Sequence, residues 1–339
     1  MKAYRGVAAF GFICIFLAIA GLLVPQNRSA PVDIASYALS SQAPLTLITE
    51  PEKGYTFIVD QIAQAQKSVD LVIYKIEDPK VLQALVDAHN RNISVRVMLE
   101  DITAFGKRPN QTAFDFLEQH HVPVAWSPNH FPLTHQKTLI FDSKRALLMT
   151  FNLTPQYYAS SRDFAILDED PSDVAAIQAT FNSDWSKRKE ITQIGNNLVW
   201  SPGSAQTLIS LIASASTTLD IYNEEMADPR IVEALKEASA RGVLVRVLMT
   251  YATSWKDELE TLREAGVMVR TYASSAKLYI HAKLIIADTH TVFIGSENFS
   301  SQSLDRNREL GILLVRPDIL SSLETTFEHD WQHARPFTH

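Results

Sequence analysis

The sequence has almost no cysteine, since Cys14 is the only one among 339 residues. A single thiol excludes an internal disulfide and any zinc or iron–sulfur site that is built from cysteines. Glycine is also scarce, with 11 residues, and charged residues make up only 20%, which excludes collagen-like repeats and highly charged disordered chains. The chain is therefore expected to fold around ordinary hydrophobic cores, and its length leaves room for two domains.

The chain contains fewer basic than acidic residues. Lys and Arg together number 31 and Asp and Glu number 38, which gives a formal net charge of −7. Acidic residues outnumber basic ones in both halves of the chain, so neither half has the basic excess that is typical of nucleic-acid-binding proteins. This balance weighs against a nucleic acid as the substrate, although a local basic groove remains compatible with it.

The longest uncharged apolar run lies at the N-terminus. Lys2 and Arg5 precede this run, which extends from Gly6 to Val24. As a helix it would reach roughly 28 Å, close to the hydrocarbon thickness of a bilayer. Residues 1–30 are therefore predicted to be a signal anchor formed by residues 6–24, with a signal peptide cleaved after Ala20 as the alternative. In either case the rest of the chain is expected on the extracytoplasmic side, periplasmic or secreted.

The two halves of the remaining chain repeat each other. Val95-Arg96-Val97 recurs 150 residues later as Val245-Arg246-Val247, and Thr180-Phe181 recurs 146 residues later as Thr326-Phe327. A net difference of four residues therefore separates the copies, and the turn-forming segment from Gly106 to Asn110 is its expected place. Self-similarity of this kind indicates an internal duplication.

Each copy alternates short β-branched runs with longer amphipathic stretches, a pattern that is typical of α/β units. We predict two tandem α/β domains, residues 45–190 and 200–335, which residues 191–202 connect. In the first copy the pattern predicts strands near 69–74, 94–99, 136–141, 145–150 and 163–167, and helices near 55–66, 79–91, 111–120 and 172–187.

One short motif occurs in both copies and carries residues of chemical interest. Because alternate side chains of a strand share a face, the histidine and the lysine of each motif should project together. Each copy thus presents an imidazole beside an ammonium group. The motif reads His-x-Lys-x4-Asp, with His135, Lys137 and Asp142 in the first copy and His281, Lys283 and Asp288 in the second.

An amide and an acid follow each motif at the same spacing, Asn152 and Asp163 in the first copy and Asn298 and Glu309 in the second. Lysine and asparagine can donate hydrogen bonds to phosphate oxygens, histidine can act as nucleophile or proton donor, and a carboxylate can orient an imidazole. Displacement at phosphorus through a covalent intermediate uses two histidines. Two copies that face each other would therefore complete a site that neither holds alone.

These residues resemble the phospholipase D superfamily, whose signature is His-x-Lys-x4-Asp followed by Gly-Ser-x-Asn. The resemblance covers residues 45–335 and implies two tandem phospholipase D-like α/β sandwich domains, related by an internal pseudo-twofold duplication and preceded here by the N-terminal hydrophobic helix. The second copy matches fully through Gly295-Ser296-Glu297-Asn298. The first copy departs, because it reads Met149-Thr150-Phe151-Asn152 and carries Asp163 in place of the glutamate.

The resemblance implies a phosphohistidine mechanism that uses no cofactor and no catalytic metal. His135 would attack phosphorus, and His281 would act as general acid and then as the base that activates water, although the two roles could be reversed. Asp163 and Glu309 would orient the histidines, and Asp163, shorter by a methylene, is expected to hold His135 less tightly. Four residues would bind the phosphate, namely Lys137, Lys283, Asn152 and Asn298, whereas Asp142 and Asp288 would be structural.

The leading interpretation is a membrane-tethered phospholipase D-type phosphodiesterase that splits the distal phosphodiester bond of a glycerophospholipid. Transphosphatidylation is the related outcome, in which an alcohol or a second lipid replaces water. The main alternative is a metal-independent nuclease that uses the same two histidines, and a non-enzymatic phosphate- or lipid-binding module is the third. Because the pairing is internal, a monomer should be complete.

Overall fold

The computed structural model describes residues 32–34, 43–102, 106–188 and 193–338, which belong to one compact unit. The predicted N-terminal helix, residues 6–24, lies outside the described residues. Among the helices that are described, none combines the length and the apolar character needed to cross a bilayer.

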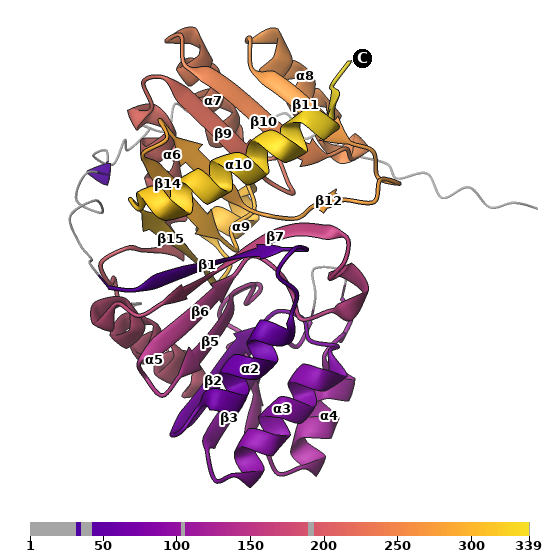
Figure 1. The fold of residues 1–339 in the computed structure, drawn as a ribbon, viewed down its shortest axis with the longest axis vertical. Helices are drawn as coiled ribbons and strands as arrows, with labels where there is room; N and C mark the ends of the chain where they lie inside the picture. Colours follow the sequence, from indigo (N-terminus) through magenta and orange to yellow (C-terminus); the bar gives the residue numbers. More distant parts are fainter. Residues whose placement is uncertain (1–31, 35–42, 103–105, 189–192, 339) are drawn as a thin grey trace, which may run out of the picture. The chain divides into compact units, whose positions relative to one another are not determined.

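Most elements occur in the same order in both copies, so the duplication extends to the secondary structure (Figure 1); β12 and β16 of the second copy have no counterpart in the described part of the first. The first copy consists of β1 Leu45–Glu50, α2 Thr56–Gln64, β2 Ser68–Ile73, α3 Pro79–Asn90, β3 Ser94–Leu99, α4 Gln111–Gln119, β4 Val124–Trp126, β5 Lys137–Phe141, β6 Arg145–Met149, η1 Pro155–Tyr157, β7 Ser161–Asp168 and α5 Pro171–Trp185. The second consists of β8 Leu198–Ser201, α6 Ser204–Ser214, β9 Thr218–Tyr222, α7 Pro229–Ala240, β10 Leu244–Thr250, η2 Thr253–Trp255, α8 Lys256–Glu264, β11 Met268–Tyr272, β12 Tyr279–Ile280, β13 Leu284–Ala287, β14 Thr291–Gly295, α9 Ser301–Asp305, β15 Glu309–Leu314, α10 Pro317–His333 and β16 Arg335–Pro336.

The sequence prediction was wrong about the segment between the copies. Residues 191–202 were expected to be a connection, but Leu198–Ser201 form strand β8, which pairs antiparallel with β15. Its counterpart β1, which was not predicted, pairs antiparallel with β7. The length difference lies where it was expected, because the segment between β3 and α4 is longer than the one between β10 and α8.

A repeated Asp-Pro pair starts the same helix in each copy. Asp78 is the N-cap of α3 and accepts a hydrogen bond from the backbone N–H of Lys80, 2.8 Å away. Asp228 does the same for α7 through the N–H of Arg230 at 2.9 Å. A proline follows each aspartate at the first helical position, where its missing N–H is not needed.

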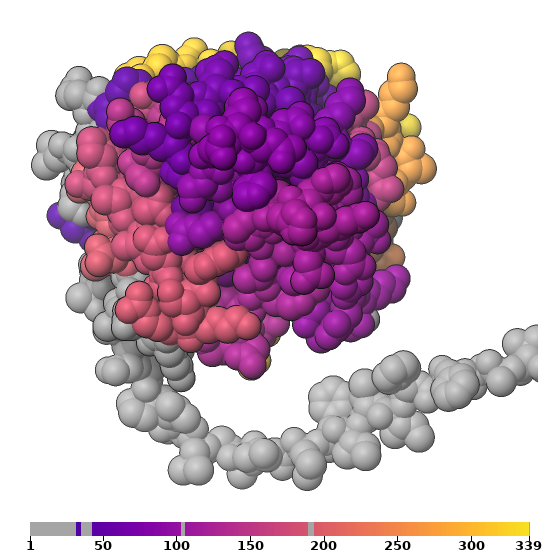
Figure 2. Space-filling view, turned by 90° about the horizontal axis from the view of Figure 1, so that it is seen from below, coloured from indigo at the N-terminus to yellow at the C-terminus, as the bar shows by residue number. Residues whose placement is uncertain are grey.

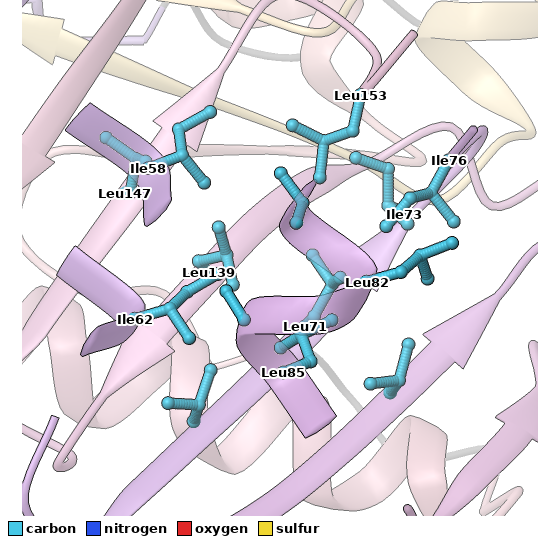
Figure 3. Packing of buried hydrophobic residues seen from close by; sticks show 14 of the residues in the cluster. Ile58, Ile62, Leu71, Ile73, Ile76, Leu82, Leu85, Leu139, Leu147 and Leu153 are labelled. Carbon is cyan, nitrogen blue, oxygen red and sulfur yellow. The ribbon is translucent and has the colours of Figure 1, made fainter. Parts of the chain in front are cut away.

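Each copy builds one mixed sheet. The order is β1-β7-β6-β5-β2-β3-β4 in the first, with β12 of the second copy added beside β7, and β16-β11-β10-β9-β13-β14-β15-β8 in the second. On one side of the first sheet, Ile58 and Ile62 of α2 and Leu85 of α3 pack against Leu71 and Leu139 of the strands (Figure 3). The face of the molecule in Figure 2 consists largely of this first copy, coloured indigo to magenta.

The other side of each sheet contributes to a core that both copies share. This core joins Phe164 of β7 and Phe181 of α5 to Tyr222 of β9 and Phe327 of α10, all fully or almost fully buried. Both faces of β7 are therefore covered, which explains why all eight of its residues are buried. The two repeats meet as halves of a single hydrophobic core.

Two buried ion pairs cross between the copies and are related by the duplication. Nε of Arg162 lies 2.6 Å from Oδ2 of Asp330, and Nε of Arg308 lies 3.0 Å from Oδ2 of Asp184. In both pairs the side chains are at most 3% exposed. Each arginine directly precedes a predicted site acid, so the ion pairs set the position of these acids relative to the opposite copy.

Candidate active site

The backbone of each motif is attached to the opposite copy. The N–H groups of His135 and Gln136 donate to the carbonyl oxygen of Arg308, at 2.9 and 3.0 Å. The N–H groups of His281 and Ala282 donate in the same way to the carbonyl oxygen of Arg162. Since an acid follows each of these arginines, every motif histidine is brought beside the acid of the other copy.

The histidine–carboxylate pairs are consequently crossed. Nδ1 of His135 donates to Oε2 of Glu309 at 2.8 Å, and Nδ1 of His281 donates to Oδ1 of Asp163 at 2.8 Å. The expectation that Asp163 would hold His135 was wrong, because the two belong to the same copy and the contacts run between copies. A hydrogen bond at Nδ1 fixes the ring and leaves Nε2 of each histidine for a reacting group.

The two lysines are buried beneath the histidines. Lys137 is 1% exposed and its Nζ donates to the carbonyl oxygen of His135 at 2.6 Å; Lys283 is fully buried and its Nζ donates to that of His281 at 2.5 Å. Burial lowers the pKa of Lys137 to about 7, and the charge of Lys283 contributes to this shift. The two ammonium groups are therefore electrostatically coupled, although they come from different copies.

In both copies a hydroxyl group accepts from the backbone N–H of the residue that follows the site acid. In the second copy, Oγ of Ser296 accepts from the N–H of Leu310 at 3.1 Å. In the first copy Thr150 takes this place, because its Oγ1 accepts from the N–H of Phe164 at 2.9 Å and donates to Oδ1 of Asp163 at 2.6 Å. The departure from Gly-Ser in the first copy thus retains the function of the serine hydroxyl.

The side chains around Gly295 leave no room for a larger residue. In the first copy, both the residue at this position and its neighbours are different. A Cβ at Gly295 would collide with the side chain of Glu297 and lie 2.7 Å from Cα of Gly311. The corresponding residues of the first copy are Met149, Phe151 and Ala165, which all belong to its hydrophobic core. A methionine therefore fits where the second copy needs glycine.

The two asparagines lie at the site, while the motif aspartates lie away from it. Asn152 lines the same pocket as His281, and the N–H of Asn298 donates to Oγ of Ser303, which donates in turn to Glu309. The amide oxygens of both asparagines are buried and have no hydrogen-bond partner in the described structure.

Asp142 and Asp288 each hold a turn that precedes a strand. Asp142 accepts from the N–H groups of residues 66–68 and Asp288 from those of residues 216–218. Burial opposes the ionised forms, but these donors lower the pKa of both carboxyl groups. The two aspartates orient the backbone that leads into β2 and β9, and neither contacts a motif histidine.

A pocket of about 640 Å³ opens beside His281. Residues of both copies line it, among them Tyr74 and Asn152 from the first and Glu224 and Tyr279 from the second. The ring of Tyr74 also contacts the ring of His135, with 4.7 Å between centroids, so one residue of the pocket wall adjoins the first motif. A larger cavity of about 870 Å³ near Glu100 and Trp126 has none of the motif residues in its wall.

Glu224 is a residue of the site that the motifs and their spacing did not predict. Its Oε2 lies 2.9 Å from Nζ of Lys283 and 3.4 Å from Nε2 of His281, and its Oε1 accepts from the hydroxyl of Tyr279 at 2.9 Å. The repeat itself offered a signal, because the position 150 residues earlier is Tyr74 and the copies differ there. Within the described residues, no group of three or more His, Cys, Asp and Glu side chains is arranged to hold a metal ion.

The fold and the site define a class of protein, a duplicated α/β protein in which two motifs contribute to a single histidine-containing site. A family described as "Cardiolipin synthase, PLD-like domain" matches the chain twice, over residues 58–185 and 208–331. These matches cover most of the chain, one in each copy. The chain therefore belongs to the phospholipase D superfamily.

Individual relatives are distant. Cardiolipin synthase 1 of Staphylococcus epidermidis strain ATCC 12228 is 22% identical over 349 residues, which is 88% of this chain and 70% of the relative. Cardiolipin synthase of Clostridium perfringens strain SM101 is 24% identical over 325 residues, which is 80% of this chain and 67% of the relative.

Solved structures show the same fold. The phosphatidylserine synthase of Haemophilus influenzae has a TM-score of 0.70 at 13% identity, with 89% of each chain covered. The polyphosphate kinase of Porphyromonas gingivalis has a TM-score of 0.67 at 15% identity; the likeness covers 85% of this chain, which spans about half (47%) of that kinase. At these identities the likeness concerns the fold alone.

Proposed function

We propose that this protein cleaves the phosphodiester bond of a glycerophospholipid on the headgroup side and transfers the phosphatidyl group to water or to an alcohol. The observation that carries the proposal is the crossed pair of hydrogen bonds, His135 to Glu309 and His281 to Asp163, each 2.8 Å long. This arrangement gives one site two oriented imidazoles, and a displacement with a covalent intermediate needs one to attack and one to transfer protons.

In the proposed first step, Nε2 of His135 forms a bond to phosphorus while the bond from phosphorus to the headgroup oxygen breaks. His281 gives its proton to that oxygen, so the headgroup leaves as an alcohol. In the second step, His281 removes a proton from water or an acceptor alcohol, whose oxygen bonds to phosphorus as the P–N bond breaks. Lys137, Lys283 and the two asparagines would stabilise the charge on the non-bridging oxygens.

The surroundings of the two rings support this assignment of roles. Burial lowers the pKa of His135 below its ordinary value, although Glu309 opposes the shift, and a nucleophile must be neutral. His281 has a carboxylate oxygen near each ring nitrogen, Asp163 at Nδ1 and Glu224 at Nε2. An imidazolium, which carries an N–H on both nitrogens, matches that arrangement and can serve as the acid.

The choice of a phospholipid is supported by the named activities of the relatives, which include cardiolipin synthases. The negative net charge of −7 also favours a lipid over a long polyanion. The test is to incubate the purified protein with vesicles of mixed phospholipids and, in parallel, with single-stranded DNA and RNA, and to analyse the products by mass spectrometry. Phosphatidic acid or an exchanged lipid is expected, and cleavage of nucleic acid alone would overturn the proposal in favour of a nuclease.

Deprotonation of Lys137 should lower the rate of cleavage on the alkaline side of the pH profile. Its pKa of about 7 means that the ammonium loses its proton as the pH rises through neutrality, so kcat/KM for a soluble phosphodiester should fall there. On the acidic side, the lowered pKa of His135 should keep the nucleophile neutral below pH ~6.5, the ordinary pKa of histidine. In Lys137→Arg the guanidinium stays charged, and the alkaline limb should move to higher pH. An alkaline limb at the same pH in both proteins would show that Lys137 is not its source.

The location of the protein is a further part of the proposal. Residues 1–30, which are outside the described structure, are proposed to anchor the chain so that the catalytic unit faces the extracytoplasmic side. Protease added to intact spheroplasts should then degrade the catalytic unit, and protection from the protease would contradict this orientation.

A further inference from the structure

Glu224 places a third carboxylate at the catalytic centre, one that neither motif contains. Its Oε2 contacts Nζ of Lys283 at 2.9 Å and Nε2 of His281 at 3.4 Å, the two atoms that a phosphate oxygen would approach. Its side chain is 26% exposed and lines the pocket. Although burial favours the neutral acid, Lys283 and His281 hold the pKa of Glu224 well below its usual range, so the carboxylate is ionised.

The first copy lacks this negative charge at the equivalent place. Tyr74 stands there, with its ring against His135 and 5.5 Å from Nζ of Lys137. The crossed histidine–acid pairs and the lysine contacts are the same in both copies, so Glu224 gives the two sides of the site a different charge. An anion in the pocket therefore meets an aromatic ring on one side and a carboxylate on the other.

The two ammonium groups of the centre differ in their partners. Each histidine is paired with a buried carboxylate of the opposite copy, and Lys283 is paired with Glu224. Among the residues that the structure describes, Lys137 has no carboxylate in an ion pair and donates instead to the carbonyl oxygen of His135. With the nucleophile His135 neutral, the charge of Glu309 also acts on Lys137, so the centre carries no excess positive charge to offset a second negative charge of a ligand.

We propose that Glu224 is a specificity-determining residue that makes the site select phosphodiesters, which carry one negative charge, over phosphomonoesters, which are predominantly dianions at pH 7. A dianion would place a second, uncompensated negative charge beside a carboxylate in a buried site, where charge repulsion is weakly screened. The inference rests on the proposed function and deepens it. When water is the acceptor, the product is a phosphomonoester lipid, and Glu224 would promote its release.

The experiment compares two small ligands that differ mainly in charge, methyl phosphate and dimethyl phosphate, by isothermal titration calorimetry at pH 7. The second pKa of a phosphate monoester is about 6, so methyl phosphate is predominantly a dianion at this pH and dimethyl phosphate a monoanion. In Glu224→Gln, the affinity for methyl phosphate should rise about tenfold more than the affinity for dimethyl phosphate. Glu224→Tyr, which copies the first repeat, should shift the ratio in the same direction and provides a second folded variant.

Glu233→Gln is the matched control, because it removes one negative charge from an exposed position on α7 and should leave the affinity ratio unchanged. Equal effects of the Glu224 variants on both ligands, or no effect in either variant, would overturn the inference. The measurement needs no turnover. A protein that failed to cleave lipids could still show the charge selectivity, and one that cleaved lipids could still lack it, so the two proposals fail separately.

Discussion

Replacing His135 by asparagine is expected to reduce kcat for phosphodiester cleavage about 10⁴-fold or more, because the variant has no nucleophile to form the covalent intermediate. His281→Asn should lose a comparable factor on a natural substrate, since both the departing headgroup and the incoming water need its proton transfer. The double variant should be no worse than either single variant, because the two histidines act in one sequence of steps. His290→Asn, at an exposed position, is the control that should retain activity.

The two variants should lose activity at different steps, and this difference separates the roles of the two histidines. With a p-nitrophenyl phosphodiester, whose leaving group needs no proton, His281→Asn should form the phosphorylated enzyme and accumulate it, while His135→Asn should form none. Trapping with a ³²P-labelled ester followed by alkaline gel electrophoresis measures this, because phosphohistidine survives alkali. Label that depended on His281 and was retained in His135→Asn would reverse the assignment, and equal retention in both variants would exclude a phosphohistidine intermediate.

Arg162→Met is expected to lower the free energy of unfolding by about 3–5 kcal/mol, the range seen when one partner of a buried ion pair is removed. Asp330 is fully buried and is held by Arg162 and by the hydroxyl of Tyr222, 2.7 Å away. In the variant, the remaining ion-pair partner of this carboxylate among the described residues would be the exposed His329, whose Nδ1 lies 3.2 Å from Oδ1 of Asp330. Urea unfolding followed by tryptophan fluorescence measures the change.

Two comparisons show whether this effect belongs to the buried pair. Lys236→Met breaks an exposed pair with Glu233 on α7 and should cost less than about 1 kcal/mol. The double variant Arg162→Met with Asp330→Asn should recover part of the loss, because the buried charge is removed together with its partner. A loss below about 1 kcal/mol in Arg162→Met would mean that the pair does not hold the two copies together.

Much of the fold could be predicted because the sequence contains an internal repeat, so that each pattern occurs twice. The Asp-Pro pairs at residues 78 and 228, the alternating strands and the offset of 146 to 150 residues all depend on neighbours close in sequence, and the structure shows the corresponding elements. Strand β8 was missed because its four residues, Leu198–Ser201, follow a turn-like segment and are recognisable as a strand only through their pairing with β15.

Some features of the site could likewise be predicted from the sequence, and others could not. The residue types and their spacing were sufficient to select His135, Lys137, His281 and Lys283, since a strand places alternate side chains on one face. Spacing along the chain could not identify the partner of each histidine, because Asp163 lies nearer to His135 in sequence yet binds His281. For Glu224 the sequence offers the difference from Tyr74 in the first copy, but a lone acid after a strand does not indicate by itself which side chains it will contact.

The amino-acid sequence by itself determined the duplicated motifs, the local elements that carry them and the superfamily, all of which follow from short-range pattern and repetition. Only the tertiary structure decided that the acids exchange partners between copies and that a carboxylate stands at the proposed phosphate site. Glu224 meets Lys283 because β9, which precedes it, lies beside β13. The histidine–acid contacts join residues of opposite copies that are more than a hundred positions apart. Their geometry depends on how two sheets pack together, which no local spacing specifies.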